Sequence, residues 1–221
     1  IEIKLQPGWH TYWRYPGDSG VPPRFDFTGS DNLAAANVSF PAPHAFTDEA
    51  GTIIGYKGNV VLPMRVVPRQ KDRPVTLRGK IDYAVCEKLC VPVEAKFELR
   101  LPPGGADNAA LDAAEARVPK PVTATQAGLK AKRAGGDKAK PLISVDLAAP
   151  SGTPVEVFVE GPTSEWALPI PKPAPGAPAG HQYFKFELDG LPPGVDAKAP
   201  ADLTFTIVQG DRATEVKTHL D

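Results

Sequence analysis

The sequence has only two cysteines among its 221 residues, Cys86 and Cys90. Two thiols are too few for a four-thiolate zinc site or for a dense disulfide scaffold. The formal net charge is −1 at pH 7, which argues against nucleic acid as a partner because phosphate binding needs a clustered positive surface. No run approaches the roughly 18 apolar residues that span a bilayer. We also expect no cofactor and no bound metal.

Proline and glycine are abundant, with 26 and 20 residues spread along the chain. Proline breaks helices and is confined to turns and strand edges, so this density favours short strands joined by turns. The hydrophobic fraction of 42% is too high for a disordered chain. The length suits two domains of about 100 residues each. We therefore predict an all-β protein of two immunoglobulin-like β-sandwich domains, joined by a linker with a short helix.

The predicted boundaries follow changes in composition. The first domain covers 1–103, the linker 104–140 and the second domain 141–221. The strands expected in the first domain are 1–5, 9–14, 23–28, 36–40, 59–67, 75–85 and 91–101. The strands expected in the second are 142–148, 154–160, 182–188, 202–208 and 213–219. Alternation of apolar and polar residues is clearest at Leu203, Phe205 and Ile207, which is typical of a half-buried strand.

The predicted linker contains an alanine-rich helix over 108–118, for which Asp107 is the expected N-cap. Residues 120–140 carry six Lys or Arg against one Asp. Such a charge run is usually a solvated linker. An alternative is a contact with anionic lipid headgroups near a membrane. A second long connection, from His44 to Gly58, carries Asp48 and Glu49, and loops of that length are often functional lids.

The two cysteines flank a short turn, Glu87-Lys88-Leu89, between two predicted strands. Side chains alternate along a strand with a period of two, so Cys86 shares a face with Arg78, Lys80 and Asp82 rather than with Leu77 and Ile81. Both sulfurs are therefore expected on the polar side, outside the core. As cross-strand neighbours, their Cα atoms would lie about 4.5–5.5 Å apart, within reach of a disulfide.

Three interpretations of the cysteine pair remain at this point. A structural staple is weak, because closing a five-residue loop is worth only about 2 kcal/mol. Two thiolates can hold Cu(I), with Met64 or a histidine in support, but none of the four histidines lies within ten residues of the pair. A redox pair needs an accessible sulfur and a nearby resolving thiol. Lys88 would favour the reactive thiolate and Glu87 would oppose it.

Several segments resemble one family of redox proteins. The run from Tyr83 to Pro92, with the sequence YAVCEKLCVP, is similar to the redox motif of the N-terminal periplasmic domain of DsbD-like transmembrane reductases, in particular the ScsB type. Other matching segments are Gly8 to Arg14, Pro16 to Pro23, Gly55-Tyr56 and Val61 to Pro63. They keep the family's order over residues 8–101. The second β-domain also suits the ScsB type, which has a larger periplasmic portion than DsbD.

The resemblance implies a periplasmic protein-disulfide reductase, the soluble portion of an inner-membrane protein, with a link to copper tolerance. A transmembrane electron-transfer domain, in the same or a partner protein, would reduce the Cys86/Cys90 pair. The pair would then reduce thioredoxin-fold proteins, with Cys90 forming the mixed disulfide and Cys86 resolving it. The family's cap loop would correspond to Phe46–Gly51, with Tyr12 and Tyr56 as further residues that shape the site.

Two departures from the DsbD pattern are visible in the residues. DsbD has five residues between its cysteines, whereas this chain has three, so the geometry toward partners should differ. The DsbD cap presents an aromatic residue directly before its glycine, whereas Ala50 precedes Gly51 here. Phe46 is the aromatic residue expected to take over the shielding.

Overall fold

The computed structural model describes residues 1–17, 20–48, 51–104, 108–137 and 139–221, apart from the side chain of Asp48. The chain divides into two units, Ile1–Val118 and Pro119–Asp221. Strands dominate both units, as expected for an all-β protein with immunoglobulin-like sandwich domains. In the described part of the chain, none of the helices has the length and apolar character needed to cross a membrane.

The first unit contains one large sheet and two small ones. The large sheet has the strand order β10-β9-β2-β6-β5, with β3 paired to β9, and the small sheets pair β4 with β8 and β1 with β7. All of these pairs are antiparallel. Trp13, Leu62 and Leu77 are among its most deeply buried side chains. The elements are β1 (Glu2–Ile3), β2 (His10–Gly17), β3 (Arg24–Asp26), β4 (Leu33–Val38), β5 (His44–Asp48), β6 (Gly51–Lys57), β7 (Val60–Val61), β8 (Met64–Pro68), β9 (Val75–Cys86), β10 (Cys90–Leu101) and α1 (Ala109–Ala116).

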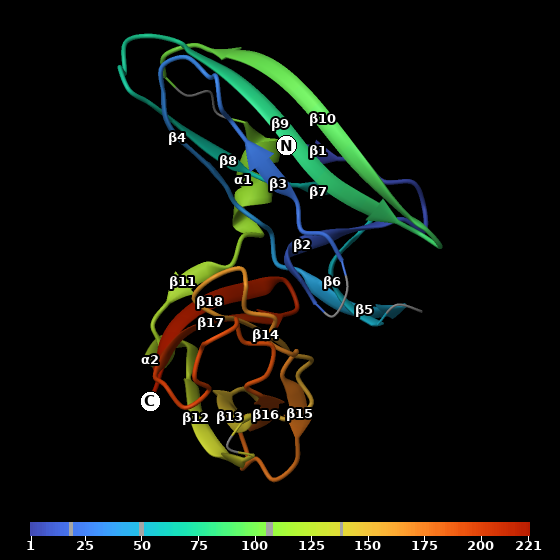
Figure 1. Cartoon of the computed structure of the whole chain (residues 1–221), viewed down its shortest axis with the longest axis vertical. Helices are drawn as coiled ribbons and strands as arrows, with labels where there is room; N and C mark the ends of the chain where they lie inside the picture. Colours follow the sequence, from blue (N-terminus) through green and yellow to red (C-terminus); the bar gives the residue numbers. More distant parts are fainter. Residues whose placement is uncertain (18–19, 49–50, 105–107, 138) are drawn as a thin grey trace. The chain divides into compact units, whose positions relative to one another are not determined.

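Strands β9 and β10 form a long hairpin (Figure 1). Cys86 ends β9 and Cys90 begins β10, so the cysteine pair flanks the turn. The register of the hairpin pairs Cys86 with Cys90 and continues without a shift to Val75 opposite Leu101. The prediction that the two cysteines are cross-strand neighbours is therefore confirmed. On the far side of β9, β3 pairs with its middle and β2 with its end, at Val85 and Cys86. The cysteines thus lie where β9 meets β2.

The second unit is a sandwich of two four-stranded sheets, with the orders β11-β18-β17-β14 and β12-β13-β16-β15. Leu203, Phe205 and Ile207 alternate into its core as expected and are at most 3% exposed. Its elements are β11 (Lys120–Val122), α2 (Ala124–Ala127), β12 (Leu129–Gly136), β13 (Pro141–Ala148), β14 (Glu156–Glu160), β15 (Lys172–Ala174), β16 (His181–Glu187), β17 (Ala201–Gln209) and β18 (Arg212–Leu220).

The segment expected as a linker is largely structured. Helix α1 belongs to the first unit and is capped by Asn108, whose side chain accepts from the Ala110 amide; the expected cap, Asp107, lies outside the described residues. Residues 120–136, expected to be solvated, form β11, α2 and β12 of the second unit instead. The charges suggested a solvated linker, but β12 exposes Lys130 and Lys132 while it buries Leu129 and half-buries Ala131 on the other side of the strand.

Residues 120–140 carry six basic residues, of which Lys138 lies outside the described part of the chain, and two of the described ones, Arg133 and Lys140, have partners that hold them in place. The guanidinium of Arg133 donates to the carbonyls of Ala197, Ala199 and Asp221. The Lys140 ammonium contacts the Asp189 carboxylate at 2.7 Å. Both cations are therefore engaged within the second unit, and the lipid-contact hypothesis rests on fewer charges than the sequence offers. It stays a prediction.

The connection from His44 to Gly58 is also more regular than a loop. It forms the β5–β6 hairpin, in which His44 pairs with Gly55 and Asp48 with Gly51. β6 then pairs with β2, a strand more than 30 residues earlier in the chain. The local sequence, rich in glycine and acidic residues, does not reveal that distant partner. A lid expected as irregular chain is thus a strand hairpin at the edge of the large sheet.

Candidate functional site: an asymmetric disulfide

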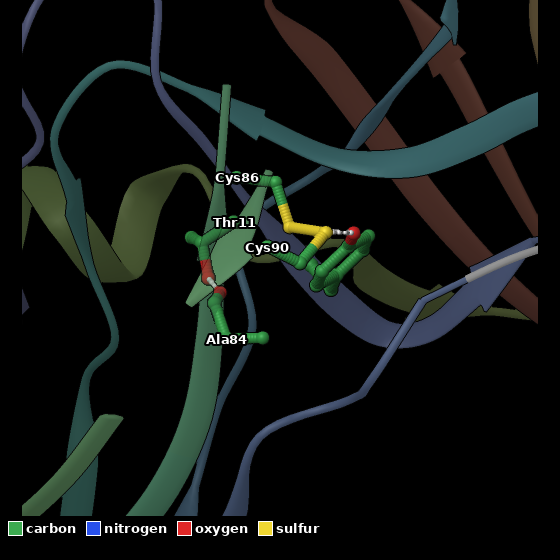
Figure 2. The surroundings of a disulfide bond; sticks show 5 residues. Thr11, Ala84, Cys86 and Cys90 are labelled. Carbon is green, nitrogen blue, oxygen red and sulfur yellow. Dashed lines mark hydrogen bonds between the residues drawn. A yellow bond between two sulfur atoms is a disulfide. The ribbon is translucent and has the colours of Figure 1, made fainter. Parts of the chain in front are cut away.

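Cys86 and Cys90 form a disulfide at the turn of the β9–β10 hairpin (Figure 2). Their Cα atoms are 4.1 Å apart, slightly closer than the cross-strand spacing of about 4.5–5.5 Å. The turn between them is exposed, and Leu89 at its tip is 80% exposed. The Gly8 backbone approaches this turn, since a side-chain carbon at position 8 would lie 3.4 Å from the Glu87 carboxylate.

The two cysteines differ sharply in exposure. Cys86 is 2% exposed, whereas Cys90 lies on the surface. Cys86 packs in a small apolar cluster with Tyr12, Ile53 and Ala84, and the half-buried Phe46 lies against this cluster. The expectation that both sulfurs point outside the core is therefore wrong for Cys86 and right for Cys90.

The error has a specific physical cause. Cys86 does share its face with Arg78, Lys80 and Asp82, because the register of the hairpin is unbroken. That face is polar in the middle of β9, where Lys80 bridges Asp82 and Glu94. Toward the end of the strand, however, the same face is covered by side chains from β2, β5 and β6. Alternation gives the side of a strand correctly, but it does not tell which side is covered at each point.

Tyr12 contacts both sulfurs with its hydroxyl group. The distance from Tyr12 Oη is 2.9 Å to Cys86 Sγ and 3.3 Å to Cys90 Sγ, and the ring is 4% exposed. Gly20, with a φ of +142°, leaves the space that this ring fills, because a Cβ there would clash with it. The resemblance placed Tyr12 near the site, and the structure adds a direct polar contact to the bond itself.

β2 is held against β9 directly beside the disulfide. The Thr11 hydroxyl donates to the Ala84 carbonyl at 2.8 Å, and both residues are buried (Figure 2). Thr11 pairs with Val85, and its neighbour His10 pairs with Cys86. This bond fixes the strand that carries Tyr12, and so fixes the phenol relative to the sulfurs.

The remaining expected site residues divide into two groups. Phe46 lies on β5 against the Cys86 cluster, as expected of a shielding residue, and the Lys57 ammonium lies 4.6 Å from the centre of its ring. Gly51 begins β6 with a φ of +132°, at the tip of the hairpin. Asp48 ends β5. Glu49 lies outside the described residues, as does the side chain of Asp48.

Tyr56 is not brought to the disulfide. It pairs with Thr11 in the sheet, so it points to the face opposite Tyr12. Its hydroxyl donates to the Pro41 carbonyl at 2.8 Å, and burial raises the pKa of this phenol well above its ordinary value. Tyr56 therefore supports the packing of the first unit on the other side of the sheet.

One residue of the site was missed in the sequence. His10 is 5% exposed, pairs with Cys86 across β2 and β9, and contacts the rings of Tyr12 and Phe46 edge-on. Distance along the sequence concealed it, since 76 positions separate it from Cys86. The available signal was its position two residues before Tyr12, because residues i and i+2 of a strand share a face.

The surroundings of the disulfide offer little support for the copper interpretation. Met64 lies on β8, which pairs only with β4 among the described strands. Within the described part of the chain, no group of three His, Cys, Asp or Glu is arranged to hold a metal ion. What the site does offer is a disulfide between a buried and an exposed cysteine, and exchange chemistry requires access to one sulfur.

The fold and the site together define a thiol–disulfide exchange module built on a β-sandwich. Residues 1–102 match the family model of the N-terminal domain of the thiol:disulfide interchange protein DsbD. This part of the chain is therefore similar to the N-terminal domain of DsbD.

Similarity to a solved structure extends over nearly the whole chain. The crystal structure of the N-terminal periplasmic domain of ScsB from Proteus mirabilis superposes with a TM-score of 0.74 at 20% sequence identity. The match covers 99% of this chain and 85% of that one. Both units thus share the fold of the ScsB domain. No curated protein matches the sequence.

Proposed function

We propose that this chain is the periplasmic electron-transfer module of a protein-disulfide reductase. The Cys86/Cys90 pair receives electrons from a transmembrane domain and passes them to thioredoxin-fold proteins in the periplasm. The observation that carries the proposal is the asymmetry of the disulfide, with Cys90 accessible and Cys86 buried under Tyr12 and Phe46. The family match of residues 1–102 supports the reaction class.

From this asymmetry we infer a role for each sulfur. A thiolate of the electron donor attacks Cys90 Sγ, the S–S bond breaks, and its electron pair goes to Cys86 Sγ. A second thiol of the donor then releases Cys90, so that both cysteines are reduced. Attack at Cys86 is hindered, because its sulfur is enclosed by the side chains of Tyr12 and Ile53.

Reduction of the partner runs through the same sulfur. The Cys90 thiolate attacks the partner's disulfide and expels one partner thiolate. Cys86 then attacks Cys90 Sγ, which re-forms the Cys86–Cys90 bond and releases the second partner thiol. The proximity of the two cysteines makes this closing step intramolecular and therefore fast.

The Tyr12 hydroxyl supports the step in which Cys86 carries negative charge. A buried thiolate is unfavourable because it loses its hydration. A phenol at 2.9 Å from Cys86 Sγ can donate a hydrogen bond to that thiolate, and bonds to charged acceptors are the strong ones. Phe46 excludes water and small oxidants from the same sulfur until a partner displaces it.

The first test is the reduction potential of the pair, measured by equilibration in glutathione buffers and by counting free thiols with a mass tag. We expect a value in the range of exchange proteins. A potential below about −300 mV would mark an inert structural bond and refute the proposal.

The second test separates the two cysteines. Cys86→Ser leaves the accessible sulfur, so it should accumulate a mixed disulfide when mixed with an oxidised thioredoxin-fold protein. Cys90→Ser leaves only the buried sulfur and serves as the matched control. Equal trapping by both variants would contradict the assignment of Cys90 as the attacking residue.

A further inference from the structure

Four residues with chemically relevant side chains form one row across the large sheet. Lys57 on β6 pairs with His10 on β2, His10 pairs with Cys86 on β9, and Cys86 pairs with Cys90 on β10. Paired residues of neighbouring strands project to the same face of a sheet, with Cβ atoms about 4.5–5.5 Å apart. The row therefore brings an imidazole next to the buried sulfur.

His10 shares the enclosure of Cys86. Its ring contacts Tyr12, at 5.6 Å between centroids, and Phe46, at 5.1 Å. These are the two aromatic rings that pack in the cluster around Cys86. Tyr12 in turn reaches Cys86 Sγ with its hydroxyl at 2.9 Å. His10, Tyr12 and Cys86 thus form a continuous buried group.

The exchange reaction creates a need for a proton at this place. Reduction of a disulfide delivers two electrons and leaves two sulfurs that each take up a proton. Cys90 can exchange its proton with water, because it is exposed. Cys86 is 2% exposed, so its proton has to come from a neighbouring group. Histidine is the side chain that ordinarily gains and loses a proton near neutral pH.

We propose that His10 is the proton store of Cys86, acting through the hydroxyl of Tyr12. The inference rests on the proposed function and adds to it how the buried sulfur gains and loses its proton. Tyr12 is the group that touches the sulfur, so in this scheme His10 acts on Cys86 through Tyr12 and not by direct contact.

The proton balance is complete in both directions. When a donor thiolate attacks Cys90, the electron pair of the S–S bond goes to Cys86 Sγ, and protonated His10 supplies a proton that leaves Cys86 as a thiol and His10 neutral. When Cys86 resolves a mixed disulfide, neutral His10 takes that proton back. The Cys86 thiolate then attacks Cys90 Sγ and the partner departs as a thiolate.

The groups that face His10 come from each element packed around it. Tyr12 lies on β2, Cys86 on β9 and Lys57 on β6, and Phe46 contributes a neutral ring from β5. Glu87 lies in the turn between the cysteines and approaches Gly8, which precedes His10 by two residues. β5 ends at Asp48, whose side chain lies outside the described residues. The Lys57 ammonium lies 4.6 Å from the centre of the Phe46 ring.

The test is the rate at which dithiothreitol reduces the disulfide between pH 5 and 8, divided by the concentration of the reductant's thiolate. In the wild-type protein we expect this corrected rate to rise by about tenfold or more toward acid pH with a single inflection, as for a general acid. His10→Phe keeps an aromatic ring in the enclosure and should give a flat profile at the lower rate. His10→Gln introduces a smaller polar side chain. The same flat profile in this second variant would show that the result for His10→Phe is not caused by a packing defect.

Two controls make the profile specific. His44→Phe removes a different, exposed imidazole from the same sheet and should keep the wild-type inflection. Tyr12→Phe combined with His10→Phe should be no slower at acid pH than Tyr12→Phe alone, since both changes interrupt one path. Persistence of the inflection in both His10 variants, or its loss in His44→Phe, would overturn the inference.

Failure of this inference can be told apart from failure of the proposed function. If the Cys86–Cys90 bond has an exchange-range potential and Cys86→Ser traps a partner, while the His10 variants keep the wild-type profile, only the role of His10 is refuted. If the wild-type bond resists reduction altogether, the proposed function itself fails.

Discussion

The contact between Tyr12 and the two sulfurs gives the sharpest quantitative expectation. Tyr12→Phe removes one oxygen atom and leaves the ring that fills the space beside Gly20 and Cys86. The oxygen lies 2.9 Å from Cys86 Sγ and 3.3 Å from Cys90 Sγ. The disulfide is a weak acceptor, whereas the Cys86 thiolate is charged and strong. The substitution should therefore act on the reaction much more than on the folded disulfide form.

The magnitude follows from the strength of a hydrogen bond to a charged group. Such a bond contributes about 1.5–3 kcal/mol, and each 1.4 kcal/mol corresponds to about a tenfold change in an equilibrium. Without the phenol, the balance between the Cys86 thiol and thiolate should shift toward the thiol by roughly 10- to 100-fold. Exchange rates follow about half of such a change on a logarithmic scale. Reduction by a small dithiol should slow by about three- to tenfold.

Two assays measure these two quantities. Ultraviolet absorbance of the thiolate during a pH titration of Cys90→Ser, with and without Tyr12→Phe, gives the ionisation of Cys86 alone; the midpoint should move upward. Stopped-flow reduction of the intact disulfide gives the rate. A thermal melt of each variant checks that the fold is retained. An unchanged Cys86 titration midpoint together with an unchanged reduction rate would show that the phenol plays no part in the chemistry.

Three further substitutions test the surroundings of the disulfide. Phe46→Ala should speed the alkylation of reduced Cys86 by iodoacetamide, because it opens the cover over the sulfur, and a rate equal to wild type would contradict the shielding role. Replacing both cysteines by serine should lower the free energy of unfolding in urea by no more than about 2 kcal/mol, and a much larger loss would favour the structural interpretation. Tyr56→Phe leaves the buried Pro41 carbonyl without its donor and should cost about 1–3 kcal/mol of stability, while the rate of disulfide reduction stays unchanged.

The cysteine hairpin was predictable because its information is local. β9 and β10 are long strands whose apolar residues alternate, and a three-residue turn sets their register. The pairing of Cys86 with Cys90 follows from that register alone. Strand β17 of the second unit was predictable from local information too, because Leu203, Phe205 and Ile207 alternate into the core.

The burial of Cys86 was not predictable in this way. Its cover comes from Tyr12, Ile53 and Phe46, on strands between 33 and 74 positions away in the sequence. The β5–β6 hairpin escaped prediction for the same reason, since its partner β2 precedes it by a long connection. The prediction that residues 120–136 form a solvated linker was wrong for a different reason. An edge strand that exposes lysines on alternate positions has the composition of a linker.

The non-local cover changes how reactivity at the pair is to be understood. The sequence alone indicates the charges of Glu87 and Lys88 as the influences on the reactivity of the pair, and these two charges oppose each other. Both residues lie on the exposed turn, where water weakens their influence. The Tyr12 hydroxyl and the enclosure by Phe46 act where the dielectric is low and interactions are stronger. Neutralising either Glu87 or Lys88 should therefore alter the reduction rate less than Tyr12→Phe does. A larger effect of either turn residue would show that the charges of the turn, and not the buried surroundings, set the reactivity of the disulfide.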